Sequence, residues 1–459
     1  MSASDELTLE ERGPTALDDV RSWIAAGNSA ELAAWLRASD AADVIYTAAQ
    51  LTDQEREGLL STLRPDQAAD LFELLPEPQR IEALQSMEPG DAAAIVHELA
   101  SDDQADIISE VENAEEILAA LDPEEAAVIR GLADYEWNTA GGLMIAEFFA
   151  FPKDLRVGEI VSRLQDAADN GDDYDVQYVY VVDDDSKLAG VLRLRDLLLS
   201  PRGRPAEALM LRDPHSVHVD DTLEQLVAFF NDHGFFGAPV LDDEGRLLGV
   251  VRASAVREAT TERSDSDYSK SQGIVGGEEL RSMPLRIRCT RRLSWLSLNI
   301  VLNVAAASII ALHQETLEAV IALAVFLPII SDMSGCSGNQ AVAVSMRELS
   351  LNVARPRDWL RVWRKESLVG IINGLALGLL IGVVAILWQG SPALGVVVGG
   401  ALALNTVVAV SIGGVVPLLL KGLKLDPALA SGPILTTVTD MCGFLLVLSF
   451  ASYAMDYLR

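Results

Sequence analysis

The C-terminal part of this 459-residue chain contains five apolar stretches, each long enough to cross a lipid bilayer. About 20 apolar residues span the hydrocarbon core as an α-helix. Because backbone polar groups must be paired inside the bilayer, we expect these stretches to be helical. We therefore predict a transmembrane domain over residues 291–459, with spans near 293–313, 317–346, 367–389, 392–420 and 427–455.

Basic residues stand beside only some of these stretches. They precede the first span and follow the second and the fourth: Arg286, Arg288, Arg291, Arg292, Arg347, Arg355, Arg357, Arg361, Arg364, Lys365, Lys421 and Lys424. The other connections have no basic residue. The positive-inside rule then places the N-terminus in the cytosol and the C-terminus outside. The chain opens without a signal peptide pattern, so we expect its first half in the cytosol of a bacterial-type inner membrane protein.

Charge divides the chain into two parts. Residues 1–262 carry 55 acidic and 19 basic residues, whereas residues 263–459 carry 13 and 16. The acidic excess has two interpretations: adaptation to salt, or carboxylates that repel one another until a divalent cation neutralises them. The three cysteines predict no disulfide framework. No His/Cys metal cluster, nucleophile elbow or phosphate loop is present, so we expect no enzyme, and nothing indicates a nucleic-acid partner.

Residues 1–136 predict an acidic domain of short helical repeats, an all-α superhelix. Three segments that start near Pro65, Pro89 and Pro123 share a proline followed by acidic or amide residues. Proline and acidic side chains are favoured in the first turn of a helix. Apolar residues then recur every three or four positions, which predicts helices that bury one face on their neighbours.

The pattern changes at Trp137 to strand, acidic turn, strand and helix, and this order occurs twice about 60 residues apart. The copies are centred on 177–198 and 237–258. This duplication resembles a tandem pair of CBS domains, an α/β module that commonly dimerises and binds adenine nucleotides. The resemblance implies CBS domains over 137–200 and 201–262, with ATP as a possible ligand. Residues 263–290 then form either a flexible tether or a connecting, plug-like helix.

Asp440 lies inside the last apolar stretch, about two turns after Pro433. A carboxylate at bilayer depth is costly, so it marks a functional site. Gly432, Thr436, Asp440 and Gly443 are expected to form one polar stripe on a helix. The alternative is a neutral, hydrogen-bonded structural carboxyl.

The second span has a polar cluster of its own, within 331–340. Small residues allow close helix approach, and Asn339 and Gln340 can bond across helices or line a wet path. Pro328 and two glycines loosen this helix, which favours a pore lining over simple helix contacts. The asparagines Asn299, Asn303 and Asn405 are expected to be contacts between helices.

The order of helical repeats, CBS pair, connecting helix and five spans resembles the MgtE family of magnesium channels. Its motifs cover nearly the whole chain: Ser337-Gly338-Asn339-Gln340 in the second span, and Asp426, Pro427, Pro433 and Asp440 around the last. The resemblance implies a homodimer in the lipid bilayer with a pore along the dimer interface. One Asp440 from each subunit would bind Mg²⁺ that keeps its water shell, a manner of binding that suits this reluctantly dehydrated ion.

The residue types and the resemblance together give the candidate site residues. The pore would bind Mg²⁺ through Asp440, Asn339, Asp332, Gly335 and Thr436, and Glu318 would lie at the outer entrance. Cytosolic Mg²⁺ would close the channel, and the candidate sensing residues are Asp91, Asp242, Asp243, Glu244, Glu258, Glu278 and Glu279.

Four positions depart from the family pattern. Cys336 replaces an amide, Asp332 is an additional carboxylate, Gly432 stands where Asn often precedes the proline, and Arg252 begins a segment that usually carries paired aspartates. A thiol favours softer metals, so Mn²⁺ or Co²⁺ is an alternative cargo. A CBS-linked membrane sensor that conducts nothing is the alternative from another class, and an inhibitory metal site is missing near Arg252.

Overall fold

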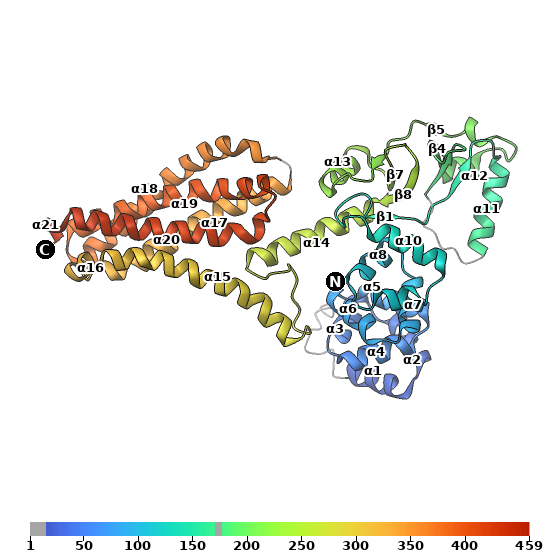
Figure 1. Ribbon diagram of the computed structural model, residues 1–459, viewed down its shortest axis with the longest axis horizontal. Coiled ribbons are helices and arrows are strands. Elements are labelled where there is room, and N and C mark those ends of the chain that lie inside the picture. Colours follow the sequence, from blue (N-terminus) through green and yellow to red (C-terminus); the bar gives the residue numbers. More distant parts are fainter. Residues whose placement is uncertain (1–14, 170–176, 352, 459) are drawn as a thin grey trace, which may run out of the picture. The chain divides into compact units, whose positions relative to one another are not determined.

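A computed structural model describes residues 15–169, 177–351 and 353–458 (Figure 1). The chain forms two compact units, one through Thr261 and one from Glu262 onward, and each is considered by itself.

The first unit begins with short helices that stack in a repeating order. Helices two places apart in the sequence contact each other, such as α3 with α5, α5 with α7, and α4 with α6. One apolar core runs through the stack from Val20 to Ile129. The prolines predicted to start helices do so in α5, α7 and α10. The bounds are α1 Thr15–Ala26, α2 Ser29–Ala38, α3 Ala41–Ala48, α4 Asp53–Thr62, α5 Pro65–Leu74, α6 Glu77–Ser86, α7 Pro89–His97, α8 Ser101–Glu110, α9 Ala114–Leu118 and α10 Pro123–Ala133.

The same unit contains two four-stranded sheets with matching topology. Their orders are β1-β8-β7-β6 and β2-β3-β4-β5, each with an antiparallel central pair and a parallel neighbour. The bounds are β1 Met144–Ile145, β2 Ala150–Pro152, α11 Val157–Asp169, β3 Tyr178–Val182, β4 Leu188–Arg193, α12 Leu194–Leu199, a 3₁₀ turn Ala206–Ala208, β5 Leu211–Arg212, β6 Val217–His218, α13 Leu223–His233, β7 Gly237–Leu241 and β8 Leu247–Arg252.

The two halves of this duplication exchange their edge strands. Strand β1 comes early in the first half but pairs with β8 of the second, with Met144 opposite Val251. Strand β5 follows the first half and pairs back onto β4, with Leu211 opposite Val191. Neither sheet is therefore complete within one sequence copy.

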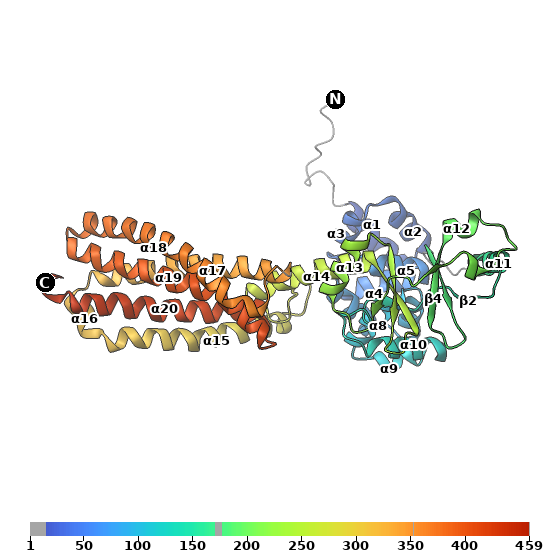
Figure 2. The same ribbon diagram turned by 90° about the horizontal axis from the view of Figure 1, so that it is seen from above.

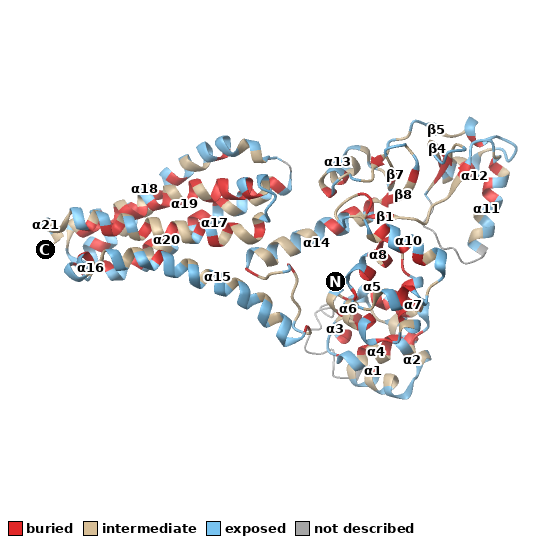
Figure 3. Cartoon of the chain, in the orientation of Figure 1, coloured by how far each residue is buried: buried red, intermediate tan, exposed pale blue. Residues whose placement is uncertain are grey.

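The second unit is helical. Its bounds are the end of α14 Ala253–Ser271, α15 Leu285–Leu312, α16 Gln314–Ala319, α17 Leu323–Ser350, a 3₁₀ turn Pro356–Asp358, α18 Trp359–Gln389, α19 Pro392–Gly422, α20 Pro427–Tyr453 and α21 Met455–Leu458. Long helices α15 and α17–α20 run side by side in both views of the ribbon (Figure 2). Helix α19 is buried along much of its length, whereas α15 is mostly exposed (Figure 3).

The connecting segment differs from the predicted helix over 263–290. Helix α14 ends at Ser271, and α15 begins at Leu285, before the predicted first span. Three glycines between them, Gly273, Gly276 and Gly277, have positive φ angles of 86°, 100° and 80°. At Gly273 a Cβ atom would overlap the indole of Trp295, so only glycine allows this turn.

Four helical segments of the described chain are long and apolar enough to cross a membrane: Leu285–Leu312, Pro356–Gln389, Pro392–Gly422 and Pro427–Tyr453. The second of the five predicted spans, 317–346, is not confirmed, because α17 has the length but carries the polar cluster around Asp332 and Asn339. The fold class of helical repeats, CBS-like α/β pair and helical membrane domain is confirmed.

Candidate functional site

Asp440 lies where three helices of the second unit meet. Helix α20 begins after Asp426, whose side chain accepts hydrogen bonds from the amides of Ala428 (2.9 Å) and Leu429 (3.4 Å). Asp440 is three turns further along and only 9% exposed. Its Oδ1 accepts a hydrogen bond from the hydroxyl of Ser331 on α17. Ser331 is not among the predicted site residues, although its place beside Asp332 in the polar cluster was a signal.

Asn405, on α19, forms hydrogen bonds with both α17 and α20 in the same region. Its Nδ2 donates to Ser334 Oγ on α17 (2.5 Å) and to the carbonyl oxygen of Thr439 on α20 (3.0 Å). Asn405 is fully buried. A Cβ atom at Gly443 would lie 2.7 Å from Asn405 Nδ2, so glycine permits this approach. The expectation that Asn405 joins helices agrees with these contacts.

The remaining predicted pore residues are more exposed than Asp440. Asp332, Asn339 and Thr436 are exposed on the surface of this unit, and Gly335 is partly buried. The predicted stripe of Gly432, Thr436, Asp440 and Gly443 falls within an arc of about 80° on α20, since each residue advances about 100° around a helix. Asp440 and Gly443 are buried, Gly432 is partly buried and Thr436 is exposed.

Glu318 lies in the short helix α16 and is exposed. Its Oε1 accepts a hydrogen bond from Gln314 Nε2 at 3.1 Å. This helix contacts α20, the helix that carries Asp440.

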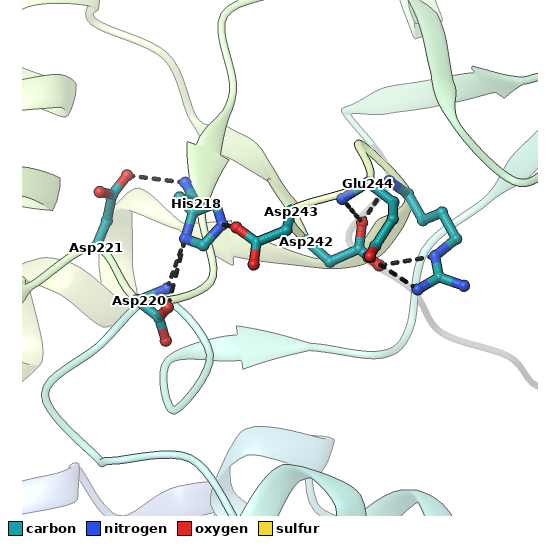
Figure 4. Close-up of polar contacts among 7 residues, drawn as sticks. His218, Asp220, Asp221, Asp242, Asp243 and Glu244 are labelled. Atoms are coloured by element: carbon teal, nitrogen blue, oxygen red, sulfur yellow. Dashed lines mark hydrogen bonds and ion pairs between the residues drawn. The ribbon is translucent and has the colours of Figure 1, made fainter.

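The side chains of the acidic turn at 242–244 make contacts with nearby residues (Figure 4). Asp242 Oδ1 accepts from the amides of Glu244 (3.0 Å) and Arg246 (2.8 Å), and Oδ2 accepts from Arg246 Nε (2.7 Å). Asp243 lies 3.1 Å from His218 Nε2. The first half builds the same turn on Asp183, which accepts from the amides of Asp185 and Lys187. Asp242 and Asp183 therefore each stabilise the turn between two strands.

The other sensing candidates are dispersed. Asp91 lies in the first turn of α7, and Glu258 is exposed on α14. Glu279 pairs with Arg288 (3.4 Å) and Arg292, and Arg291 donates to the carbonyl of Glu278. The hydrogen bond from Arg292 holds the pKa of Glu279 below its usual value. Within residues 15–169, 177–351 and 353–458, no three His, Cys, Asp or Glu side chains are grouped so as to hold a metal ion.

The first unit has a cavity of about 240 Å³ between the two sheets. Aromatic side chains and two guanidinium groups line it, among them Phe148, Tyr178, Tyr180, Phe236, Arg252 and Arg257. Tyr180 is 2% exposed, and its hydroxyl has no hydrogen-bond partner in the part of the chain that the structure describes. An aromatic cavity with two guanidinium groups and an unsatisfied polar atom suits a ligand with a ring and an anionic group. None of these lining residues was predicted as a nucleotide ligand from the sequence.

The end of α14 contacts the turn that precedes α20. Lys270 Nζ lies 3.1 Å from Asp426 Oδ2. Burial raises the pKa of Asp267, which lies on the same helix turn as Lys270 and feels the negative charge of Asp426. The connecting segment is thus joined through charge to the helix that carries Asp440.

Comparison with known proteins gives matches along most of the chain. A family model described as a divalent cation transporter, MgtE, matches residues 327–450, and one described as the MgtE intracellular N domain matches 36–138. The CBS domain model matches 140–202 and 206–262.

Individual relatives agree with these matches. The magnesium transporter MgtE of Thermus thermophilus is 36% identical over 342 residues, 73% of this chain and 74% of that protein. The magnesium transporter MgtE of Enterococcus faecalis is 34% identical over 334 residues, 73% of each chain. A crystal structure of the soluble part of a magnesium transporter is 26% identical and covers 54% of this chain and 98% of its own, with a TM-score of 0.48.

Proposed function

Since this chain belongs to the MgtE family of divalent cation transporters, we propose that it passes hydrated Mg²⁺ through the membrane at a site built around Asp440. The relatives are named as magnesium transporters, which supports transport rather than catalysis. The observation that carries the proposal is the carboxylate of Asp440, oriented by Ser331 inside an apolar helix. Mg²⁺ dehydrates reluctantly, and a carboxylate that binds its water shell lets the ion leave again.

The pore is proposed to form between two copies of the chain. Asp332, Cys336, Asn339 and Gln340 are exposed on one side of α17. Polar side chains that face hydrocarbon are costly, so this surface requires a partner or water. A second copy would place two such surfaces opposite each other and bring Asp332, Asn339, Gly335 and Thr436 to one water-filled path with Asp440. Glu318, outside the bundle core, would concentrate cations at the entrance.

The orientation is proposed from charge. The segment before α15 and the one between α17 and α18 are rich in arginine, which favours the cytosolic side for both. The N-terminus then lies in the cytosol and the C-terminus outside.

We propose that the acidic first unit controls opening and closing of the channel through α14. High cytosolic Mg²⁺ would screen repulsion among the carboxylates and favour a closed channel. The candidate sensing residues of this proposal stay Asp91, Asp242, Asp243, Glu244, Glu258, Glu278 and Glu279. The ion pair of Lys270 with Asp426 supports a direct connection from α14 to the pore helix. The cavity lined by Tyr178 and Arg257 is proposed to bind an adenine nucleotide such as ATP.

Flux in proteoliposomes tests the transport proposal. Wild-type protein, Asp440→Asn and the control Asp456→Asn are compared for uptake of Mg²⁺, Mn²⁺, Co²⁺ and Ca²⁺. Asp456 is exposed on α21, beyond α20, and its removal should leave uptake unchanged. Asp440→Asn should lower Mg²⁺ uptake at least about tenfold, because the pore carboxylate supplies the charge that attracts the cation. Unchanged uptake in Asp440→Asn would overturn the pore assignment.

The same assay separates the alternatives. Faster uptake of Mn²⁺ or Co²⁺ than of Mg²⁺ would support the softer cargo that Cys336 allows. Absence of any uptake by the wild type would support a sensor that conducts nothing. For gating, protease cleavage between 260 and 285 should slow as Mg²⁺ rises, and cleavage that is indifferent to Mg²⁺ would favour salt adaptation as the reason for the acidic first unit.

A further inference from the structure

Arg252 links two parts of the first unit that are far apart in the sequence. It is the last residue of β8, in the second sheet, and Asp102 is at the start of α8, in the helical repeats. Arg252 Nη2 donates to both carboxylate oxygens of Asp102, at 3.2 and 3.0 Å. The Asp102 side chain is only 10% exposed and that of Arg252 34%, so the pair is largely shielded from water.

A second contact lies beside this ion pair. Ser101 Oγ donates to Glu147 Oε2 at 2.7 Å and accepts from the amide of Ala146 at 2.8 Å. Ala146 and Glu147 directly follow β1, which pairs with β8 in the same sheet and contacts α8. Arg252 and Ser101 together define a polar junction between the repeats and the sheets.

The surroundings of this junction are acidic. Burial and the charge of Asp102 raise the pKa of Asp103 to about 7, and burial and the charge of Asp70 raise the pKa of Glu73. Carboxylates this close together repel one another, and a nearby cation reduces that repulsion. A regulatory metal does not fit as the junction's cation, since no group of three suitable ligands exists among the described residues and a guanidinium already neutralises Asp102.

We propose that Arg252 is the built-in cation of this junction, so that the helical repeats are held on the second CBS domain without a divalent ion. A guanidinium presents fixed N–H donors and stays charged at all physiological pH values. Unlike a bound metal, it cannot leave when cytosolic Mg²⁺ falls. Under the proposed function, Mg²⁺ must therefore be sensed at another place in the chain. Only this consequence for regulation rests on the proposed function; the role of Arg252 as the cation of the junction does not.

Hydrogen exchange on the full-length protein tests this inference. The reporter is the Ala146 amide, whose hydrogen bond to Ser101 exists only while the junction is closed. In the wild type its exchange rate should differ less than about twofold between EDTA and millimolar Mg²⁺. Arg252→Met, which keeps the length but not the charge, should speed exchange about tenfold in EDTA, because Asp102 is left buried and unpaired.

Controls keep the result interpretable. The double variant Asp102→Arg with Arg252→Asp restores the opposite charges and should recover part of the protection, which a merely misfolded variant would not do. Arg195→Met, a change of arginine on α12 in the other half of the duplication, should leave the Ala146 amide unaffected. Slowing of wild-type exchange tenfold by Mg²⁺, but not by NaCl at equal ionic strength, would overturn the proposal. Unchanged exchange in Arg252→Met would overturn it too. Mg²⁺ uptake by the same protein tests the transport function separately.

Discussion

The hydroxyl of Ser331 on α17 donates a hydrogen bond to the carboxylate of Asp440 on α20, 109 positions later in the chain. One oxygen of the carboxylate is thereby held in place, and we propose that the other meets a cation or its water. The backbone carbonyl of Ser331 accepts from Ser334 (3.0 Å), and Ser334 in turn accepts from Asn405 (2.5 Å). The side chain that we propose to meet the ion thus rests on a polar network of three helices.

Removal of the Ser331 hydroxyl should impair transport more than folding. In Ser331→Ala, Asp440 is free to rotate, and we expect Mg²⁺ uptake to fall about tenfold, as for loss of one hydrogen bond to a charged group. Ser331→Thr keeps the hydroxyl and should retain most of the uptake. Both are measured in proteoliposomes, with the melting temperature of the detergent-solubilised protein as the check on folding. Equal uptake by the alanine variant and the wild type would show that Ser331 does not orient Asp440.

Asn405 should be important for stability of the helical unit. Asn405→Leu removes two hydrogen bonds and leaves the Thr439 carbonyl without this donor, at a cost of about 1–3 kcal/mol. Asn303 is the matched control, since it is exposed and its amide donates to the Asn299 carbonyl of its own helix. Thermal unfolding in one detergent should therefore show a clear loss for Asn405→Leu and almost none for Asn303→Leu. The reverse order would contradict the network.

Helices α18 and α19 approach through facing glycines. A Cβ atom at Gly399 would lie 2.5 Å from the carbonyl oxygen of Gly378, whereas one at the next position, Gly400, would meet only Phe450 at 3.7 Å. Gly399→Ala should therefore destabilise by about 1–3 kcal/mol through overpacking, and Gly400→Ala should be nearly neutral. Urea unfolding of the two variants side by side measures the difference. Equally small losses of stability for the two variants would show that α18 and α19 can move apart at Gly399 without cost.

Acid should loosen the segment between α14 and α15. The pKa of Glu279 is held below its unfolded value of 4.5 by the hydrogen bond from Arg292. A lowered folded pKa means that the stabilisation is present above pH 4.5 and is lost as the pH falls through the lower folded value. Proteolysis of residues 272–284 by an acid-active protease should accelerate below that pH in the wild type. Glu279→Gln should cleave faster already at neutral pH and show a weaker acid response; a wild-type pH profile for this variant would refute the prediction.

Several parts of the fold follow from local sequence patterns. Apolar length predicts α18, α19 and α20, because a bilayer-spanning helix needs about 20 apolar residues whatever its neighbours are. Prolines at first turns and three- or four-residue periodicity predict the helical repeats, and the alternation of strands and acidic turns predicts the duplicated sheets. These features depend on residues within one or two turns of each other.

The site is predicted less completely. Asp440 is conspicuous in the sequence because a carboxylate in an apolar helix is rare, but nothing nearby in the chain indicates its partner Ser331. The acidic turn at Asp242 looks like a cation site in sequence, yet it is satisfied by its own amides and by Arg246. A count of carboxylates cannot distinguish the two cases, since only the folded geometry shows which oxygens are already paired.

What the sequence by itself determines is therefore the order and type of the elements, since helix length, helix starts and strand alternation are local properties. The tertiary structure decides how distant elements meet. It exchanges β1 and β5 between the two halves, turns Asp332 outward while Asp440 turns inward to Ser331, and pairs Arg252 with Asp102 across 150 positions. Each of these outcomes depends on side-chain packing between segments far apart in the chain, where the energy of contact and not the local pattern selects the partner.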